Sequence, residues 1–150
     1  MPTCSLEGRV LVVDDEENVR LLLQRGLARL EPSLQVRVAN SSVQALEFLR
    51  DEFFDLVVTD YQMPGMNGLE LVEAIHQSYP NTKVVLMTAY PSAQVTEQVD
   101  RLALDAYILK PFSTRHLQEI IHDLLALPGL SFFTPGGNGR DHRKVQNTGC

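Results

Sequence analysis

Acidic, hydroxyl and amine side chains stand directly after four of the short apolar runs in this sequence. They are Asp14 and Asp15 after the first run, Asp60 after the third, Thr88 after the fourth and Lys110 after the fifth. If the runs are neighbouring parallel strands, their carboxyl ends meet at one edge of the sheet, where open α/β sheets hold their ligands. We therefore expect these five side chains to form one site.

This group of residues has the chemistry of a cation and phosphoryl site. Carboxylates about 4 Å apart repel by roughly 4 kcal/mol per pair at an effective dielectric constant of about 20, so positive charge must lie between them. Oxygen ligands suit Mg²⁺ or Mn²⁺, whereas softer metals prefer His or Cys, which are absent from the group. A divalent ion and Lys110 would together hold a dianionic phosphoryl group, and Asp60 is placed to receive it.

The elements that must position these side chains follow from the hydrophobic pattern. Short apolar runs predict strands at residues 9–13, 34–39, 56–59, 83–87 and 106–109. Apolar residues three and four positions apart predict a helix that ends before Pro32, helices at about 42–50, 68–79 and 92–102, and a last helix capped by Ser113 or Thr114. The side chains predicted to face the core from these helices are Val19, Leu22, Leu23, Leu27, Leu30, Val43, Leu46, Leu49, Leu69, Val72, Ile75, Leu117, Ile120, Ile121, Leu124 and Leu125.

Strands that alternate with helices predict an α/β fold, a doubly wound five-stranded parallel sheet with helices on both faces. The strand at 34–39 alternates apolar and polar residues, which suits a sheet edge and the flavodoxin-like order 2-1-3-4-5. The domain is predicted to span residues 9–127, after an N-terminal extension of residues 1–8. Residues 128–150 are rich in Gly, Pro and polar side chains, which predicts a flexible tail from which Phe132 and Phe133 could dock.

Composition and charge exclude several classes of protein. The chain has 150 residues, 44% of them hydrophobic, which is enough for one domain with a proper core. The net charge is −6, and the segment after residue 127 carries Arg140, Arg143 and Lys144 against Asp141, which leaves −8 for residues 1–127. A domain with this charge is not expected to bind nucleic acid directly.

The sequence also predicts the compartment. No apolar run approaches the ~18 residues of a membrane span, and the first residues do not have the pattern of a secretory signal. Cys4 and Cys150 match no disulfide or metal spacing. We therefore expect a cytoplasmic protein with reduced thiols and no membrane partner.

Five separated motifs make the chain resemble the receiver domain of bacterial two-component response regulators. The resemblance covers about Arg9 to Leu127, and the matching residues are Asp14-Asp15, Asp60 followed by Met63-Pro64 and Gly68, Thr88-Ala89, Tyr107, and Lys110-Pro111-Phe112. It implies a phosphorylation-dependent signalling switch rather than an enzyme. Asp60 would accept a phosphoryl group from the phosphohistidine of a histidine kinase or from a small phosphodonor.

The resemblance implies a metal site around the acceptor. Asp15, Asp60 and the backbone carbonyl of Gln62 would ligate Mg²⁺ or Mn²⁺, and Asp14 would act mostly through water.

It also implies a set of switch residues. Lys110 would bind a phosphoryl oxygen, and a cis peptide before Pro111 would aim it inward. Thr88 would move toward the phosphoryl group when it arrives, and Tyr107 would turn from an outward to an inward position.

The partners implied by the resemblance are a sensor histidine kinase or phosphotransfer protein as the donor, and an output protein or domain that the sequence does not identify. Phosphorylation would change the surface made by the helix at 92–102, the strand at 106–109 and the last helix, and a phosphorylation-dependent dimer could form there. Residues 128–150 are too few for an output domain, so the chain is either a stand-alone receiver or an N-terminal fragment of a longer regulator.

Simpler interpretations exist for the single residues. Asp14 or Asp15 could cap a helix, Asp60 could form a turn, and Tyr107 could serve only as core packing. A metal-dependent aspartyl phosphohydrolase is the alternative function, but those enzymes resemble this chain less because they carry a second acid where Gln62 stands.

One residue, Ala103, departs from the family pattern, and Gln62 and Tyr90 stand at positions where family members vary. Ala103 stands where a Gly commonly ends the helix at 92–102, so we expect that turn to differ. Our hypothesis for Tyr90 is that its bulk restricts the attacking water and slows loss of the phosphoryl group. Decay of the phosphoprotein at the same rate in Tyr90→Ala would refute it.

Overall fold

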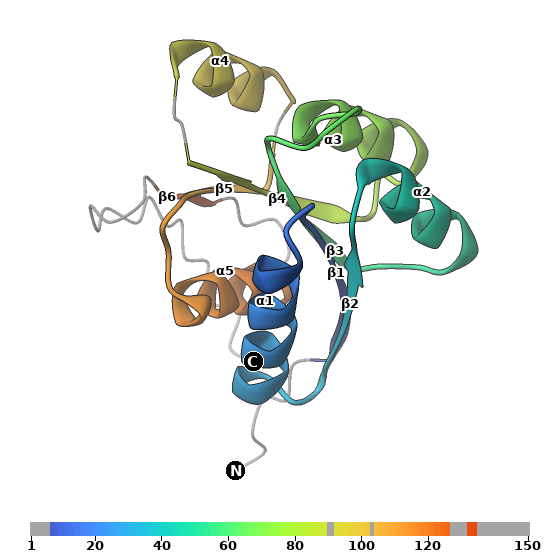
Figure 1. The fold of residues 1–150 in the computed structure, drawn as a ribbon, viewed down its shortest axis with the longest axis vertical. Coiled ribbons are helices and arrows are strands. Elements are labelled where there is room, and N and C mark those ends of the chain that lie inside the picture. The colour runs from blue at the N-terminus through green and yellow to red at the C-terminus, as the bar shows by residue number, and fades with distance from the viewer. Residues whose placement is uncertain (1–6, 90–91, 103, 127–131, 135–150) are drawn as a thin grey trace.

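Parallel strands form the centre of the computed structural model, and helices cover both faces of the sheet (Figure 1). The structure describes residues 7–89, 92–102, 104–126 and 132–134. The strands run in the order β2-β1-β3-β4-β5-β6, and all pair in parallel. They are β1 (Gly8–Val13), β2 (Leu34–Ala39), β3 (Leu56–Asp60), β4 (Lys83–Thr88), β5 (Ala106–Leu109) and β6 (Phe132–Thr134).

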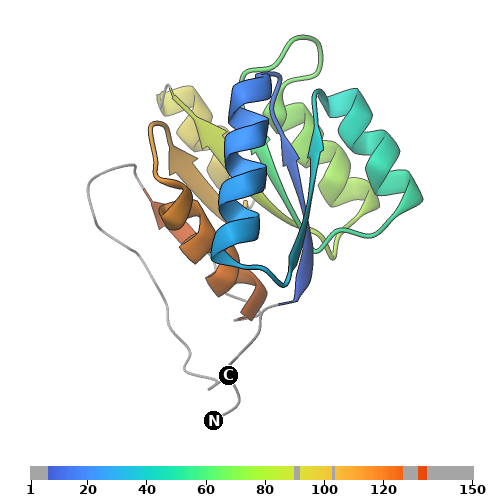
Figure 2. The ribbon, with the colours of Figure 1, turned by 60° about the horizontal axis from the view of Figure 1, so that its bottom comes forward.

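Five helices connect the strands and divide between the two faces. They are α1 (Glu17–Leu30), α2 (Ser42–Asp51), α3 (Gly68–Ser78), α4 (Ala93–Leu102) and α5 (Thr114–Ala126). Helices α1 and α5 lie on one face, and α2, α3 and α4 lie on the other (Figures 1 and 2). The doubly wound sheet and the order 2-1-3-4-5 predicted from the sequence are confirmed, with bounds within about one residue of the prediction.

Alternate residues of the buried strands supply two separate cores. In β1, Val10 and Val12 pack with the residues of α1 and α5, whereas Leu11 and Val13 pack on the side of α2 to α4. Every residue of β3 is buried, because helices cover it on both sides. This is why its sequence is a continuous apolar run up to Asp60.

Two side chains predicted to face the core are exposed instead. Leu22 in α1 and Val43 in α2 are each 63% exposed. Successive helical residues are rotated by about 100°, so the face that buries Leu23 and Leu27 turns Leu22 toward solvent. In α2, the buried stripe consists of Ser42, Ala45 and Leu49. The predictions for Leu22 and Val43 were therefore wrong, because apolar spacing alone did not fix which of two neighbouring positions points inward.

The strand β6 was not predicted. The sequence after residue 127 predicted a flexible tail, but Phe132–Thr134 pairs in parallel with β5 along Ala106–Ile108. Three residues are too few for a hydrophobic period to reveal a strand. The rest of the predicted tail, and residues 1–6 of the predicted N-terminal extension, lie outside the described residues, whereas Gly8 already belongs to β1.

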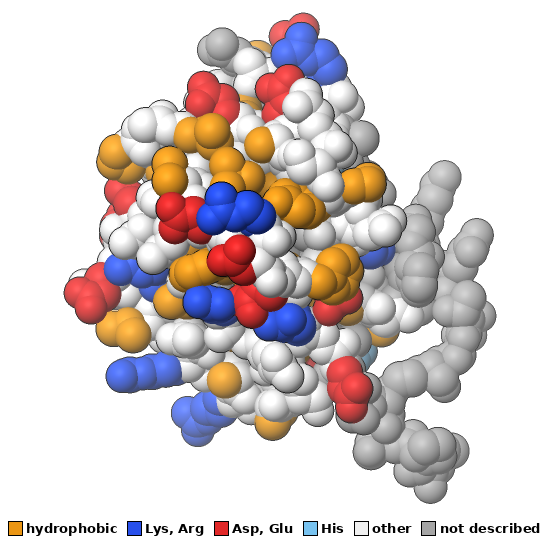
Figure 3. Space-filling model, turned by 90° about the vertical axis from the view of Figure 1, so that its right-hand side faces the viewer, with side chains coloured by type: hydrophobic (Ala, Val, Ile, Leu, Met, Phe, Trp, Pro, Cys, Tyr) orange, Lys and Arg blue, Asp and Glu red, His pale blue; other side chains and the backbone are white. Residues whose placement is uncertain are grey.

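The surface beside α2 mixes charges of both signs with apolar side chains (Figure 3). Glu52, after α2, pairs with Arg9 of β1 at 2.6 Å and with Arg37 of β2. The guanidinium group of Arg37 also lies 3.8 Å from the centre of the Phe48 ring. In the part of the chain that the structure describes, no helix is both long and apolar enough to cross a membrane.

Candidate functional site

Strand pairing brings the predicted site residues to one edge of the sheet. Val13 lies opposite Thr59, so Asp14 and Asp60 follow neighbouring strands at the same level. Thr88 ends β4 beside Leu109, and the backbone N–H of Lys110 donates to the Thr88 carbonyl at 2.8 Å. The sheet therefore gathers the five side chains that the sequence predicted to meet.

Asp14 is the most enclosed of the three acids. It is fully buried, and its Oδ1 accepts a hydrogen bond of 2.9 Å from the Glu16 backbone N–H. The Arg20 side chain donates to the Asp14 carbonyl oxygen at 2.8 Å, which ties the first turns of α1 to the end of β1. Asp15, by contrast, is exposed at the mouth of the site.

Lys110 holds two of the carboxylates together. Its Nζ lies 3.2 Å from Asp60 Oδ1 and 3.3 Å from Asp14 Oδ2. Burial alone would lower the pKa of the Lys110 amine, but the carboxylates of Asp60 and Asp14 outweigh it, so this pKa lies above its ordinary value. Lys110 is thus a fixed cation beside Asp60.

The surroundings of the Asp60 carboxyl group disfavour its charged form. Burial raises its pKa above the ordinary value, Lys110 lowers it in part, and the nearby Asp14 and Asp15 raise it further. One ammonium group therefore does not fully compensate the three acids. The net charge of the group is therefore negative, which favours binding of a second cation.

The three acids also fit a divalent metal in their donor atoms. Asp14, Asp15 and Asp60 each offer a carboxylate oxygen, and these oxygens lie within 4.8 Å of one another. Such an all-oxygen set matches Mg²⁺ or Mn²⁺ and does not suit a softer metal. Gln62, whose carbonyl was predicted as a further ligand, lies two residues beyond Asp60 in the loop after β3, with its side chain exposed.

The loop between β3 and α3 is built to stay close to Asp60. A Cβ atom on Gly68 would lie 2.2 Å from the Asp60 carbonyl oxygen, so only glycine fits there. Gly65 has a φ of 76°, in the left-handed region that glycine enters most easily. The buried Ser42 hydroxyl of α2 donates to the Met66 carbonyl at 2.9 Å and anchors the far side of the loop.

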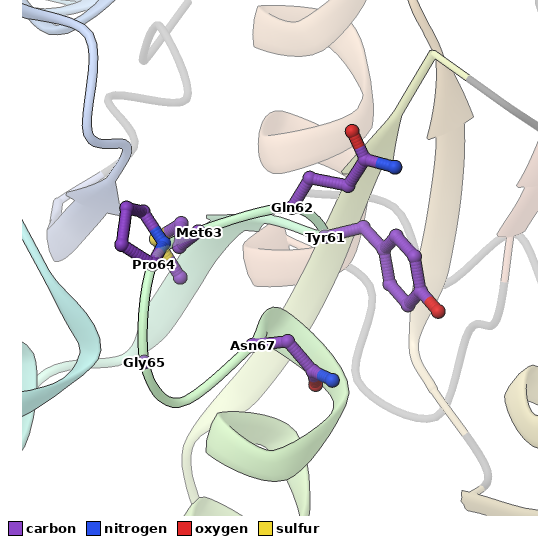
Figure 4. Close-up of a pocket in the computed structure, with 6 residues that line it drawn as sticks. All are labelled: Tyr61, Gln62, Met63, Pro64, Gly65 and Asn67. Atoms are coloured by element: carbon purple, nitrogen blue, oxygen red, sulfur yellow. The ribbon is translucent and has the colours of Figure 1, made fainter.

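This loop borders an open pocket of about 460 Å³ lined by Tyr61, Gln62, Met63, Pro64, Gly65 and Asn67. Figure 4 shows the side chains of Tyr61 and Gln62 directed away from Pro64. Met63 is buried, whereas Gln62 and Pro64 are exposed. The loop after Asp60 is therefore open to solvent at Gln62 and Pro64, and Met63 fixes it in the core.

The remaining predicted residues occupy distinct positions. Thr88 is buried at the end of β4, and Tyr107 in β5 is 9% exposed and packs in the core on the α4 side. Burial raises the pKa of the Tyr107 hydroxyl. The peptide between Lys110 and Pro111 is cis, as the family resemblance implied. Tyr90 and Ala103 lie outside the described residues.

Sequence reasoning missed the residues that support the site from α1 and α2. Arg20 and Gln24 of α1 were not among the predicted site residues, but Arg20 donates to the Asp14 carbonyl and Gln24 donates to the Val36 carbonyl at 3.3 Å. Ser42 was predicted as the beginning of a helix and not as an anchor for the loop after β3. These are side chain to backbone contacts between distant residues, for which a single sequence has no periodic signal.

Comparison with known proteins identifies the family. The family model of the response regulator receiver domain matches residues 10–122. This chain belongs to that family. As a receiver, it is part of two-component signalling and has a regulatory role.

Relatives of the receiver include both long and short proteins. The response regulator protein PilR of Pseudomonas aeruginosa is 36% identical over 119 residues, and the match covers 79% of the receiver but 26% of PilR. The regulatory protein AtoC of Escherichia coli is likewise covered over 26% of its length. The sporulation initiation phosphotransferase F of Bacillus subtilis is 29% identical over 122 residues, which is 97% of that protein.

Solved structures agree with the fold. A CheY-like response regulator receiver domain protein from Methanospirillum hungatei superposes with a TM-score of 0.75 at 31% identity. The alignment covers 80% of this chain and 94% of that one. The receiver thus corresponds to nearly a whole protein in some relatives and to about a quarter of the length of others.

Proposed function

We propose that this receiver is a phosphorylation-dependent switch in which Asp60 accepts the phosphoryl group. The observation that carries the proposal is the position of the Lys110 Nζ, 3.2 Å from Asp60 and 3.3 Å from Asp14, with Asp15 completing the acidic group. A buried carboxylate that lies beside a fixed ammonium group and an exposed acid, Asp15, is suited to attack on phosphorus.

In the proposed reaction, an Asp60 carboxylate oxygen attacks the phosphorus of a phosphohistidine or of a small acyl phosphate. The new bond joins Asp60 oxygen to phosphorus, and the bond from phosphorus to the donor nitrogen or oxygen breaks. The donor leaves as imidazole, which takes a proton from solvent, or as a carboxylate. Lys110 remains protonated and neutralises a phosphoryl oxygen throughout, which its raised pKa favours.

A divalent ion would be held by Asp15, Asp60 and the Gln62 carbonyl, with Asp14 in support. When bound, Mg²⁺ would offset the negative charge of the acids and of the incoming phosphoryl oxygens. Asp14 also orients the site, because its Oδ2 contacts Lys110 while its Oδ1 accepts the Glu16 N–H.

The donor that we propose is a sensor histidine kinase or a phosphotransfer protein. Support comes from the relatives, which are named response regulators and, in one case, a sporulation phosphotransferase. Thr88 and Tyr107 are the proposed switch residues. Tyr107 already lies inward in this structure, so the proposed outward position would belong to a second state of the unphosphorylated protein.

Phosphoryl transfer from acetyl phosphate tests the proposal. The purified chain is incubated with acetyl phosphate, with and without Mg²⁺, and incorporation is measured by intact-protein mass spectrometry. We expect Mg²⁺-dependent incorporation of one phosphoryl group, and none in Asp60→Asn. The matched control is Asp100→Asn, which removes an exposed acid of α4 far along the chain and should leave incorporation unchanged. Incorporation that survives Asp60→Asn would refute the assignment.

The same samples separate a switch from a phosphohydrolase. An amide, Gln62, stands two residues after Asp60, where that class of enzyme needs an acid. We therefore expect no sustained turnover of a phosphomonoester such as p-nitrophenyl phosphate under conditions that phosphorylate Asp60.

A further inference from the structure

The outer edge of β5 is covered by a strand from the same chain. Phe132, Phe133 and Thr134 of β6 lie opposite Ala106, Tyr107 and Ile108. Figures 1 and 2 show β6 at the end of the sheet, beyond β5. β6 follows α5 by only five residues, 127–131, and it pairs with the strand that precedes α5.

The covered strand is one that would otherwise attract partners. β5 has the apolar sequence Ala-Tyr-Ile-Leu, and its inner edge pairs with β4. Without β6, its outer backbone N–H and C=O groups would form an open strand edge, which is a template for pairing with another chain. A second copy of this receiver presents the same edge, and two such edges can pair about a two-fold axis.

The covering strand is short enough to be displaced. It has three residues, and Pro135 follows it directly, which has no N–H to extend the pairing. Its advantage is that it is tethered, because a short connection gives an effective concentration on the order of millimolar. A second copy at micromolar concentration therefore loses the competition for β5 as long as β6 is intact.

We propose that β6 is an autoinhibitory edge strand that keeps the receiver monomeric by occupying the β5 edge, and that a second copy of the chain pairs there when β6 leaves. The edge of β5 that β6 covers includes Tyr107, and β5 ends at Leu109, directly before Lys110. A second part of the proposal rests on the proposed phosphorylation of Asp60. When Asp60 is phosphorylated, Lys110 and β5 move toward the phosphoryl group, and this movement weakens the pairing between β5 and β6.

Proline substitutions in β6 test the first part without any phosphorylation. Successive N–H groups of a strand point to opposite sides, so Phe133→Pro and Thr134→Pro form a matched pair in the full chain. One of them removes an N–H directed at β5, and the other removes one directed away from it. Far-UV circular dichroism and the thermal unfolding midpoint report whether each variant remains folded.

We expect one member of this pair to lower the dimer dissociation constant at least tenfold, measured by sedimentation velocity over a concentration series. Hydrogen exchange at Ala106–Leu109 in dilute, monomeric samples of the same variant should become at least tenfold faster than in the parent. If both variants remain folded and stay as monomeric as the parent, the inference is wrong. The inference is also wrong if the parent dimerises as strongly as the variants do.

Beryllofluoride with Mg²⁺, a mimic of the phosphoryl group, tests the coupling. We expect at least tenfold faster hydrogen exchange at Phe132–Thr134 when it binds, and no change in Asp60→Asn. Binding itself is followed separately by ¹⁹F NMR. Absence of binding would refute the proposed function, whereas binding with unchanged exchange at β6 would refute only the coupling. The proline pair tests the autoinhibitory strand in either case.

Discussion

Asp60 carries its charge among two other acids and one ammonium group. Its position at the end of β3 follows from the continuous apolar run before it, and its pKa is raised by burial and by the neighbouring acids. Lys110 offsets part of this effect at a distance of 3.2 Å. The proposed phosphoryl acceptor is therefore a source of instability in the metal-free protein, as is common for ionisable groups in functional sites.

Asp60→Asn should stabilise the metal-free receiver. Because the native pKa of Asp60 lies above its ordinary value, the native state binds this proton more tightly than the unfolded chain does. Stability is then lost as the pH rises from the ordinary carboxyl range through the raised pKa. The asparagine variant lacks this loss, and at neutral pH its free energy of unfolding should be higher by about 1 kcal/mol, or roughly 2–4 °C in melting temperature.

Thermal unfolding in EDTA at several pH values measures this effect. The gap between Asp60→Asn and the parent should widen from acid to neutral pH, while Asp100→Asn should stay within about 0.5 kcal/mol of the parent throughout. A variant that is less stable than the parent at neutral pH would show that the charge of Asp60 is fully compensated by Lys110.

The helices and strands show which parts of the fold a single sequence can predict. The order of the sheet followed from five apolar runs and the half-polar strand β2, because burial on both faces leaves a clear pattern. The site followed from the residues at the strand ends. What could not be predicted depends on contacts between distant residues, as with Ser42 and Met66, or on a segment too short for periodicity, as with β6.

Leu22 and Leu23 in α1 were both predicted to face the core, but only Leu23 is buried in the structure. Leu23 is 2% exposed in the core between α1 and α5, so Leu23→Ala should lower the free energy of unfolding by about 2–5 kcal/mol. Leu22 is exposed, and Leu22→Ala should change it by no more than about 0.5 kcal/mol. Urea denaturation of both variants measures the difference. Equal losses would mean that both side chains are buried, as the sequence pattern predicted.

At the scale of the whole molecule, β6 covers the β5 edge of the sheet, and β2 forms the other edge. Gln24 donates to the carbonyl of Val36 on β2, and β6 pairs along β5 at the opposite end. The acidic group lies between these edges, at the carboxyl ends of β1 and β3, and its three members come from two separate segments of the chain. A cation bound there would therefore stabilise the fold as a whole.

Mg²⁺ should accordingly raise the melting temperature of the receiver. Binding to the native state alone contributes roughly 2.7 kcal/mol when free Mg²⁺ exceeds its dissociation constant about 100-fold. Asp15→Asn should lose most of this gain, because it removes a proposed ligand that is exposed, without disturbing Asp14 or Lys110. The comparison is made at constant ionic strength with Asp100→Asn as the control. An equal gain in Asp15→Asn would place the ion elsewhere.

The identity of the modified residue tests the central claim most directly. Borohydride reduces an acyl phosphate to an alcohol, so a phosphorylated aspartate is recovered as homoserine. After reaction with acetyl phosphate and Mg²⁺, reduction and proteolysis, peptide sequencing by mass spectrometry should find homoserine at residue 60 and aspartate at residues 14 and 15. Homoserine at residue 14 or 15, or no homoserine in a sample that carries the phosphoryl group, would contradict the account.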